Sequence, residues 1–201
     1  MMEWLCIGDS ITERNFRTSL NYHDYVASRL GLEVLNEGFS GTGFLRDFEG
    51  NVNYLKRLRM IEPKPGIVTV MGSFNDCSLL HEGFEGNFEK ALEEQMDKYF
   101  SILLGFYPTS LVAAISPSPW CTHYGTQPYV EIMRRVSARH CIPFLDLCTR
   151  SPLRPWEAEN NRKYFSCAAA PDGDGVHPNE LGHKLIAARV EAFLRENWPF
   201  F

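Results

Sequence analysis

Short hydrophobic runs of strand length recur along the chain and are separated by longer amphipathic segments. The runs cover residues 4–7, 33–36, 66–71, 109–116 and 143–148. Most of them are nearly continuous in apolar residues, with little alternation between apolar and polar positions. This pattern is typical of strands buried on both faces of a parallel sheet. We therefore expect five buried strands.

Apolar residues at helical spacing predict four helices between and after these strands. The helices cover residues 20–31, 87–108, 127–141 and 178–197. Gly31 suits the C-cap of the first helix, Pro108 stops the second, and Pro178 suits the first turn of the last. The second segment has the clearest amphipathic pattern.

The alternation of strands and helices predicts a three-layer α/β/α sandwich with a mainly parallel five-stranded sheet, in one domain over residues 1–201. Residues 149–176 form the least regular stretch, which is too long for an idle connection. Whether that stretch closes over a substrate is left open by the sequence. In an open α/β sheet, ligands bind beyond the carboxyl ends of the strands, so the residues that follow each strand are the candidates for function.

Small and polar residues follow the first three predicted strands and precede the last predicted helix. The four segments are "GDS" (8–10), "NEGFSGTG" (36–43), "GSFND" (72–76) and "DGDGVHPNELGH" (172–183). The predicted fold would gather all four on one edge of the sheet. These are the residue types that a reaction centre requires.

A serine hydroxyl becomes a useful nucleophile only when a base removes its proton. His177 is the candidate base for Ser10, and Asp174 is placed three residues earlier to orient the imidazole. Attack on a carbonyl group also builds negative charge on its oxygen, which needs preplaced donors. The backbone N–H groups of Ser10 and Gly41 and the side-chain amide of Asn75 are the candidate donors.

The four segments resemble the motif blocks of the SGNH hydrolases, also called GDSL esterases or lipases, and they occur in that family's order. The resemblance implies a nucleophile at Ser10, an oxyanion hole at Ser10, Gly41 and Asn75, and an acid and base at Asp174 and His177. It also implies the flavodoxin-like form of the sandwich and a serine esterase that uses no cofactor.

The resemblance extends from residue 4 to about residue 190, with two departures. Ile11 replaces the usual leucine, which is a conservative change. Ser73 stands two residues before Asn75, where the family has glycine, and Gly72 lies one step earlier. A side chain at position 73 could narrow the site or re-aim Asn75.

Several residues near the motifs have alternative interpretations. We expect Asp9 to cap a following helix and support the site. Asp172 competes with Asp174 as the orienting acid, and His183 is interpreted as structural. These two residues could also join Asp174 and His177 as metal ligands in a metal-dependent phosphoesterase, although their spacing matches no familiar zinc motif.

Aromatic residues in or near loops at the predicted active edge are candidates for a substrate pocket: Phe44, Phe74, Trp120, Tyr124, Trp156 and Phe165. Such rings could stack on a sugar or line an acyl slot. No long apolar lid helix is evident, so the sequence favours short-acyl esters, such as acetyl esters of carbohydrates or other small alcohols. The alternatives are a lysophospholipase or thioesterase for longer acyl chains and a non-catalytic carbohydrate-binding protein.

Charge and composition narrow the class of partner. The 201 residues are 44% hydrophobic, which fits a globular protein, and carry a formal net charge of −5. This charge argues against nucleic acid, since phosphate binding needs a basic patch. The basic clusters at 56–59 and 134–135 are interpreted as solvated faces. A small-molecule ester is therefore the expected partner, and the oligomeric state stays open.

No run approaches the roughly 18 apolar residues of a membrane span, and the chain as given shows no export signal. The six cysteines include no CxxC pair, and several lie in apolar runs. We therefore expect reduced thiols and a cytoplasmic protein.

Overall fold

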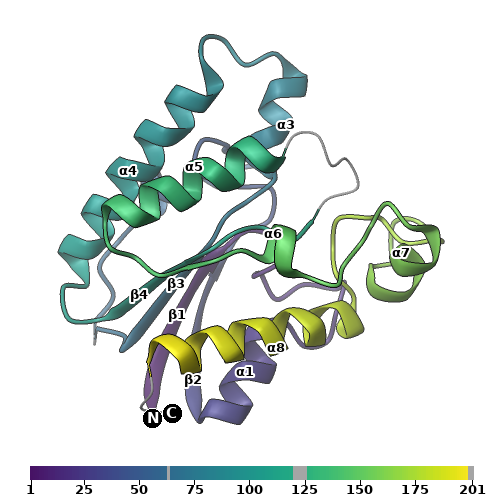
Figure 1. Cartoon of the computed structure of the whole chain (residues 1–201), viewed down its shortest axis with the longest axis horizontal. Helices are drawn as coiled ribbons and strands as arrows, with labels where there is room; N and C mark the ends of the chain where they lie inside the picture. Colours follow the sequence, from purple (N-terminus) through teal and green to yellow (C-terminus); the bar gives the residue numbers. More distant parts are fainter. Residues whose placement is uncertain (63, 120–125, 199–201) are drawn as a thin grey trace.

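Five parallel strands form the centre of the computed structural model, which describes residues 1–62, 64–119 and 126–198 (Figure 1). The strands are β1 (Met2–Gly8), β2 (Leu32–Gly38), β3 (Ile67–Met71), β4 (Leu111–Ile115) and β5 (Phe144–Leu145). Their order is β2-β1-β3-β4-β5, and every neighbouring pair is parallel. The predicted sheet is confirmed. However, the strand expected over 143–148 pairs through two residues only.

The helices of the described ranges are α1 (Tyr22–Leu30), α2 (Tyr54–Arg57), α3 (Asn75–Glu82), α4 (Phe88–Phe106), α5 (Thr126–Arg139), α6 (Leu147–Arg150), α7 (Ala158–Tyr164) and α8 (Glu180–Asn197). The four longer helices α1, α4, α5 and α8 are those that the apolar spacing predicts. Helices α2, α3, α6 and α7 were missed because segments of four to eight residues are too short to show a helical period.

Two helical layers cover the sheet, with α4 and α5 on one face and α1 and α8 on the other (Figure 1). The side chains of β1 alternate between the two faces of the sheet and pack against the two helical layers in turn. Leu5 and Ile7 pack in the core on the α4 and α5 side, whereas Trp4 and Cys6 pack on the α1 and α8 side. Burial on both faces is the physical reason that the strand sequences are almost continuously apolar.

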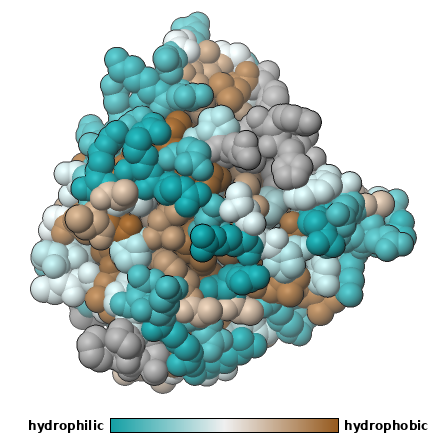
Figure 2. Space-filling view, viewed as in Figure 1, coloured by the Kyte–Doolittle hydropathy of each residue, from teal (hydrophilic) through white to brown (hydrophobic). Residues whose placement is uncertain are grey.

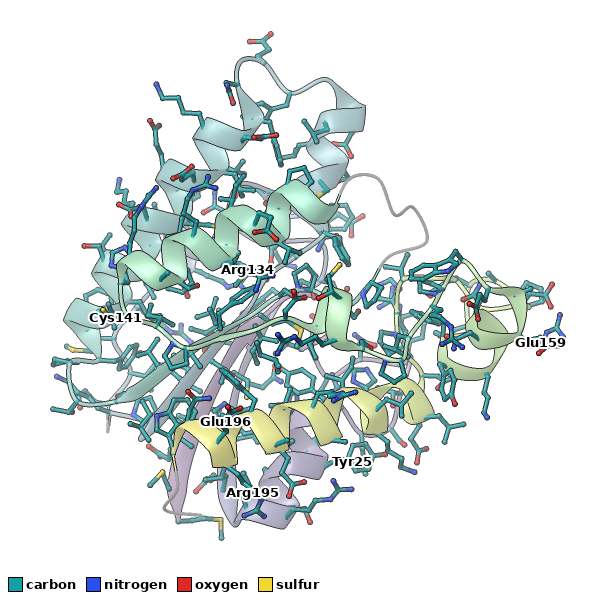
Figure 3. All side chains as sticks on the ribbon, viewed as in Figure 1. Tyr25, Arg134, Cys141, Glu159, Arg195 and Glu196 are labelled. Carbon is teal, nitrogen blue, oxygen red and sulfur yellow. The ribbon has the colours of Figure 1, made fainter. Side chains whose placement is uncertain are left out.

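The edge strand β5 lies in a groove of about 380 Å³ between α5 and α8, where apolar residues show between hydrophilic helices (Figure 2). Arg134 of α5 donates a hydrogen bond to Asp146 (2.7 Å), and its guanidinium lies over the ring of Phe144. Glu196 lines the same groove from α8 (Figure 3). Because β5 pairs through only two residues, this edge offers little backbone for pairing with another strand.

The last helix is held close to the end of the preceding loop. Asn179 is its N-cap and accepts hydrogen bonds from the backbone N–H groups of Leu181 and Gly182. Pro178 therefore precedes the cap and is not in the first turn, which corrects the sequence prediction. Because the cap fixes the chain directly after His177, the helix start also positions that histidine.

Close backbone approach joins the loops that follow β1 and β2. A Cβ atom added at Gly38 would lie 2.2 Å from the backbone N of Glu13. The turn that contains Ser10 therefore packs directly against the end of β2, and only glycine fits there.

The segment over 149–176 contains ordered structure and is anchored near its end. Phe165 is fully buried, and residues 165 and 178 form an isolated antiparallel bridge. Ser166 donates its backbone N–H to His177 O (2.8 Å) and accepts one from Asp174. These contacts tie the end of the loop to the core.

The structure also bears on the expectations about membrane spans and cysteines. Among the described helices, none combines the length and the apolar character needed to cross a membrane. The cysteines in the described ranges form no disulfide with one another: Cys6, Cys77, Cys141, Cys148 and Cys167.

Replacing Leu103 of α4 with alanine tests the core. Leu103 is fully buried, so the cavity and lost apolar contact should lower the free energy of unfolding by about 2–5 kcal/mol in urea titrations. Ser101→Ala on the exposed side of the same helix should change it by less than about 0.5 kcal/mol. Equal effects of the two substitutions would contradict this packing.

Candidate active site

The structure brings Ser10, His177 and Asp174 into one hydrogen-bonded row. The Oγ of Ser10 lies 3.0 Å from Nε2 of His177, and Nδ1 of His177 lies 2.8 Å from Oδ2 of Asp174. A carboxylate can only accept, so Nδ1–H donates to Asp174 and the neutral Nε2 can accept the Ser10 proton. The two chain segments are 167 residues apart in sequence. This row can take a proton from a hydroxyl and stabilise the resulting imidazolium.

The Asp174 carboxylate is fixed by the turn that it caps. Its Oδ1 accepts the backbone N–H groups of Val176 (3.0 Å) and His177 (2.8 Å). Partial burial acts to raise the pKa of Asp174, but hydrogen bonds from the His177 ring and the two backbone groups outweigh it and lower the pKa. Asp174 therefore stays ionised and holds the imidazole in one orientation.

Asp9 holds the turn that presents Ser10. Its Oδ1 accepts the N–H of Ile11 (2.9 Å), and its backbone carbonyl accepts those of Thr12 and Glu13. The expectation that Asp9 caps a helix is wrong, because a turn and not a helix follows β1. Burial raises the pKa of Asp9, while hydrogen bonds from Ser73 and Ile11 oppose the rise.

Two backbone donors are free near Ser10. Within the described ranges, neither Ser10 N–H nor Gly41 N–H has an intramolecular hydrogen-bond acceptor. Gly41 has a φ of +75°, and a Cβ there would lie 2.2 Å from the Phe48 ring. The backbone at position 41 therefore depends on glycine for both its conformation and its space.

Asn75 is the first residue of α3, and its side-chain amide lies next to the Gly41 segment. Its Nδ2 donates to the carbonyl of Thr42, which follows Gly41, at 3.0 Å. Thus the three donors expected from the sequence come from the ends of β1, β2 and β3. They are the groups that can bind a developing oxyanion.

Asp76 is a supporting residue that the sequence analysis missed. It is fully buried, and its carboxylate accepts the backbone N–H groups of Phe44 (2.9 Å), Leu45 (2.8 Å) and Arg46 (3.0 Å). Burial raises the pKa of Asp76 to about 6 against the effect of these hydrogen bonds. Asp76 fastens the loop after β2 to the start of α3. The available signal was its place directly after Asn75 in "GSFND".

Arg57 is half-buried, which corrects its interpretation as part of a solvated face. Its guanidinium donates to Gly8 O and Thr42 Oγ1, both at 2.7 Å. It also lies over the rings of Phe39 (4.8 Å) and Tyr54 (4.4 Å). Arg57 therefore links the end of β1 to the Gly41 loop. Helix α2 is too short for its sequence to reveal this inward direction.

The aromatic pocket candidates are placed differently from the prediction. Phe44 and Phe165 are fully buried in the two cores, so they cannot line an open pocket, and Phe74 is 7% exposed. Trp156 is 41% exposed. Trp120 and Tyr124 lie outside the described residues. Phe48, which is not among the predicted pocket residues, is half-buried and packs against Gly41.

Asp172 and His183 make contacts away from the row. Asp172 is exposed and pairs with Arg162, whereas His183 is buried and accepts the backbone N–H of Tyr22 on Nδ1 (3.2 Å). Burial, together with the nearby His23, lowers the pKa of His183 to about 3. Within the described ranges, no group of three or more His, Cys, Asp or Glu side chains is placed to hold a metal ion.

Known proteins are similar to this chain in sequence and in fold. The sequence model of the GDSL-like lipase/acylhydrolase family matches residues 6–185. A GDSL lipase of Mycobacterium tuberculosis is 25% identical over 201 residues, which cover 92% of this chain and 78% of that protein.

Three solved structures illustrate the likeness of fold. A protein from Lactobacillus plantarum superposes with a TM-score of 0.78, at 21% identity and 97% coverage of both chains. A carbohydrate acetylesterase family member from Sinorhizobium meliloti gives 0.65, at 17% identity and full coverage of both. A family two carbohydrate esterase from Clostridium thermocellum gives 0.69, at 15% identity, over all of this chain and 65% of that one.

Replacing Asp76 with alanine tests the anchor of the Gly41 loop. Three backbone N–H groups would lose their shared acceptor, one of them buried and two part-buried, and an unsatisfied buried donor costs about 1–3 kcal/mol. The free energy of unfolding should therefore fall by about 2 kcal/mol or more. Asp172→Ala, which removes only an exposed ion pair, should cost less than about 1 kcal/mol. A loss at Asp76 no larger than at Asp172 would sink this assignment.

Proposed function

The chain belongs to the GDSL-like lipase/acylhydrolase family and is a carboxylic ester hydrolase, and from this premise we propose that it acts by acyl transfer to Ser10. The observation that carries the proposal is the unbroken row from Ser10 Oγ through the His177 ring to Asp174, with contacts of 3.0 and 2.8 Å. A base that an acid orients is sufficient to activate the serine hydroxyl.

In the first half of the reaction, Ser10 Oγ attacks the acyl carbonyl while His177 Nε2 takes the hydroxyl proton. Asp174 keeps Nδ1 protonated and stabilises the imidazolium. The N–H groups of Ser10 and Gly41 and the amide of Asn75 bind the oxyanion. His177 then gives its proton to the leaving alcohol, which leaves an acyl group on Ser10.

In the second half, water attacks the acyl-enzyme. His177 again accepts a proton, now from the water, and returns it to Ser10 Oγ as the acid departs. The same three donors bind the second oxyanion. The cycle restores the row in its starting protonation state.

We propose short-acyl esters of carbohydrates or other small alcohols as the substrates. Phe48 fills the space beside Gly41 and so limits the room for an acyl chain on that side. The half-buried Ser40 donates a hydrogen bond to Glu13, and this polar pair joins the Gly41 segment to the Ser10 turn. Polar groups of this kind suit a hydroxylated alcohol. The fold is also that of two proteins named as carbohydrate esterases, which supports a carbohydrate ester as the proposed substrate.

Hydrolysis of p-nitrophenyl esters from acetate to palmitate tests both the class and the chain length. We expect kcat/KM to be highest at acetate and to fall as the chain lengthens. Ser10→Ala should lower kcat by at least about 10³-fold without loss of folded protein, because the nucleophile is removed. Ser101→Ala is the matched control on a distant exposed surface and should keep full activity.

Other results of the same assay would select other functions. A maximum at long chains would favour a lysophospholipase or thioesterase. Loss of activity in a chelator, with no labelling of Ser10 by a fluorophosphonate, would favour a metal-dependent phosphoesterase. Full activity in Ser10→Ala would refute the acyl-transfer proposal, and no cleavage of any ester by the wild type would favour a binding protein.

Gly41→Ala tests the backbone donor. Gly41 and Gly50 both have positive φ angles, +75° and +86°, but only a Cβ at position 41 meets another side chain. We expect Gly41→Ala to lower kcat by about 10²-fold, because the Phe48 ring and the backbone must shift and misplace the N–H. Gly50→Ala should keep kcat and lose only about 1–2 kcal/mol of stability. Equal kcat values would contradict the role of Gly41.

A further inference from the structure

Ser73 occupies the position of the motif glycine, and every donor and acceptor site of its hydroxyl is hydrogen-bonded. It is fully buried, two residues after β3. Its Oγ donates to Asp9 Oδ2 (2.6 Å) and accepts from both the backbone N (3.1 Å) and the Nδ2 (2.7 Å) of Asn75. One donor and two acceptor sites are all that a hydroxyl offers. The residue is therefore built into the network and is not a simple replacement for glycine.

These contacts fix the direction of the Asn75 amide. Its two N–H groups have three acceptors in reach: Ser73 Oγ (2.7 Å), Thr42 O (3.0 Å) and Asp9 Oδ2 (3.3 Å). Because Ser73 Oγ and Asp9 Oδ2 lie only 2.6 Å apart, one N–H faces both of them. The other N–H faces Thr42, beside the Gly41 donor. The amide plane is thus held from its buried side.

Asp9 orients the Ser73 hydroxyl by accepting its hydrogen bond. The carboxylate is 4% exposed, and its other oxygen accepts the N–H of Ile11. Oδ2 accepts the Ser73 hydroxyl at 2.6 Å, so one carboxyl group holds both the Ser10 turn and Ser73. A chain of contacts therefore runs from the residue preceding Ser10, through Ser73, to Asn75.

We propose that Ser73 is a positioning residue of the oxyanion site. Its hydroxyl, oriented by Asp9, holds one N–H of Asn75 so that the second N–H, which faces Thr42 O beside the Gly41 N–H, also donates to the oxyanion when substrate reacts. This inference rests on the proposed role of Asn75 in ester hydrolysis. Glycine at position 73 would leave the inner N–H with only the 3.3 Å contact to Asp9.

A positioning role predicts a loss in kcat and not in KM, because the oxyanion exists only in the transition state. Steady-state kinetics should use the p-nitrophenyl ester that the wild type cleaves fastest. We expect Ser73→Ala and Ser73→Gly each to lower kcat by about 10- to 100-fold, less than or equal to the loss on removing an oxyanion donor. KM should stay within about twofold.

Ser116 offers a matched control for the loss of any buried serine. It is also fully buried, and its Oγ donates to Pro117 O and accepts the N–H groups of Leu147 and Cys148. Ser116→Ala should lower the melting temperature about as much as Ser73→Ala but leave kcat within about twofold. An equal fall of kcat in both variants would assign Ser73 a structural role only and overturn the proposal.

An arylboronic acid gives a second readout, since it forms a tetrahedral anionic adduct on a serine hydroxyl. We expect Ser73→Ala to weaken its inhibition by the same factor as kcat, while the product acid inhibits equally in both proteins. Unchanged boronate affinity would refute the positioning role. Asp9→Asn, which keeps the shape of the residue, should lower kcat in the wild type but add little in Ser73→Ala. Additive losses would contradict the chain of contacts.

The outcomes also separate this inference from the function on which it rests. If Ser10→Ala abolishes hydrolysis while Ser73→Ala and Ser73→Gly keep the wild-type kcat, the esterase proposal stands and the role of Ser73 is wrong. If Ser73→Ala does not fold, Ser73→Gly and Asp9→Asn decide by the same kcat criterion. Ester hydrolysis that persists in Ser10→Ala would overturn both.

Discussion

The site depends on one repeated interaction, in which an aspartate side chain accepts backbone N–H groups from the loop that it must hold. Asp9 does so for the Ser10 turn, Asp76 for the loop after Gly41, and Asp174 for the turn that carries His177. Loops beyond the strand ends have no ladder partners for their backbone groups, and buried groups of that kind need acceptors. A charged acceptor forms stronger hydrogen bonds than a neutral one and fixes the loop more firmly.

The balance between desolvation and hydrogen bonding differs among these aspartates. Full burial raises the pKa of Asp76 to about 6 although three backbone donors face it, whereas the half-buried Asp174 has a lowered pKa with two such donors and the His177 ring. The difference follows from solvent access, since desolvation penalises the charged form most where water is excluded. The more exposed Asp174 is therefore the aspartate suited to stabilise an imidazolium, and the buried Asp76 is suited to hold a loop.

The sequence predicted those features that depend on local pattern or on motif order. Continuous apolar runs follow from burial of each strand on both faces, and the long helices follow from their apolar spacing. Ser10, Asn75 and His177 could be named because each follows a strand or precedes a helix. The Arg57 side chain points inward because rings and a carbonyl group from other segments contact its guanidinium. Its basic neighbours in the sequence suggested an exposed side chain instead. Phe44 and Phe165 were misplaced for the same reason, since loop-like flanking residues do not reveal tertiary burial.

The effect of serine in place of the motif glycine at position 73 can be understood only from the contacts in the folded structure. The sequence left two effects open, a narrower site or a re-aimed Asn75. The first requires the side chain to face the open site, but Ser73 is fully buried and its hydroxyl donates to Asp9, 64 residues earlier. The second remains, because the same oxygen accepts from the Asn75 amide. A hydroxyl with two lone pairs and one proton can join a carboxylate to an amide, whereas glycine would leave only the 3.3 Å contact between Asp9 Oδ2 and the Asn75 amide. The departure thus adds Ser73 Oγ to the link between the Ser10 turn and Asn75, which would otherwise rest on that longer contact alone.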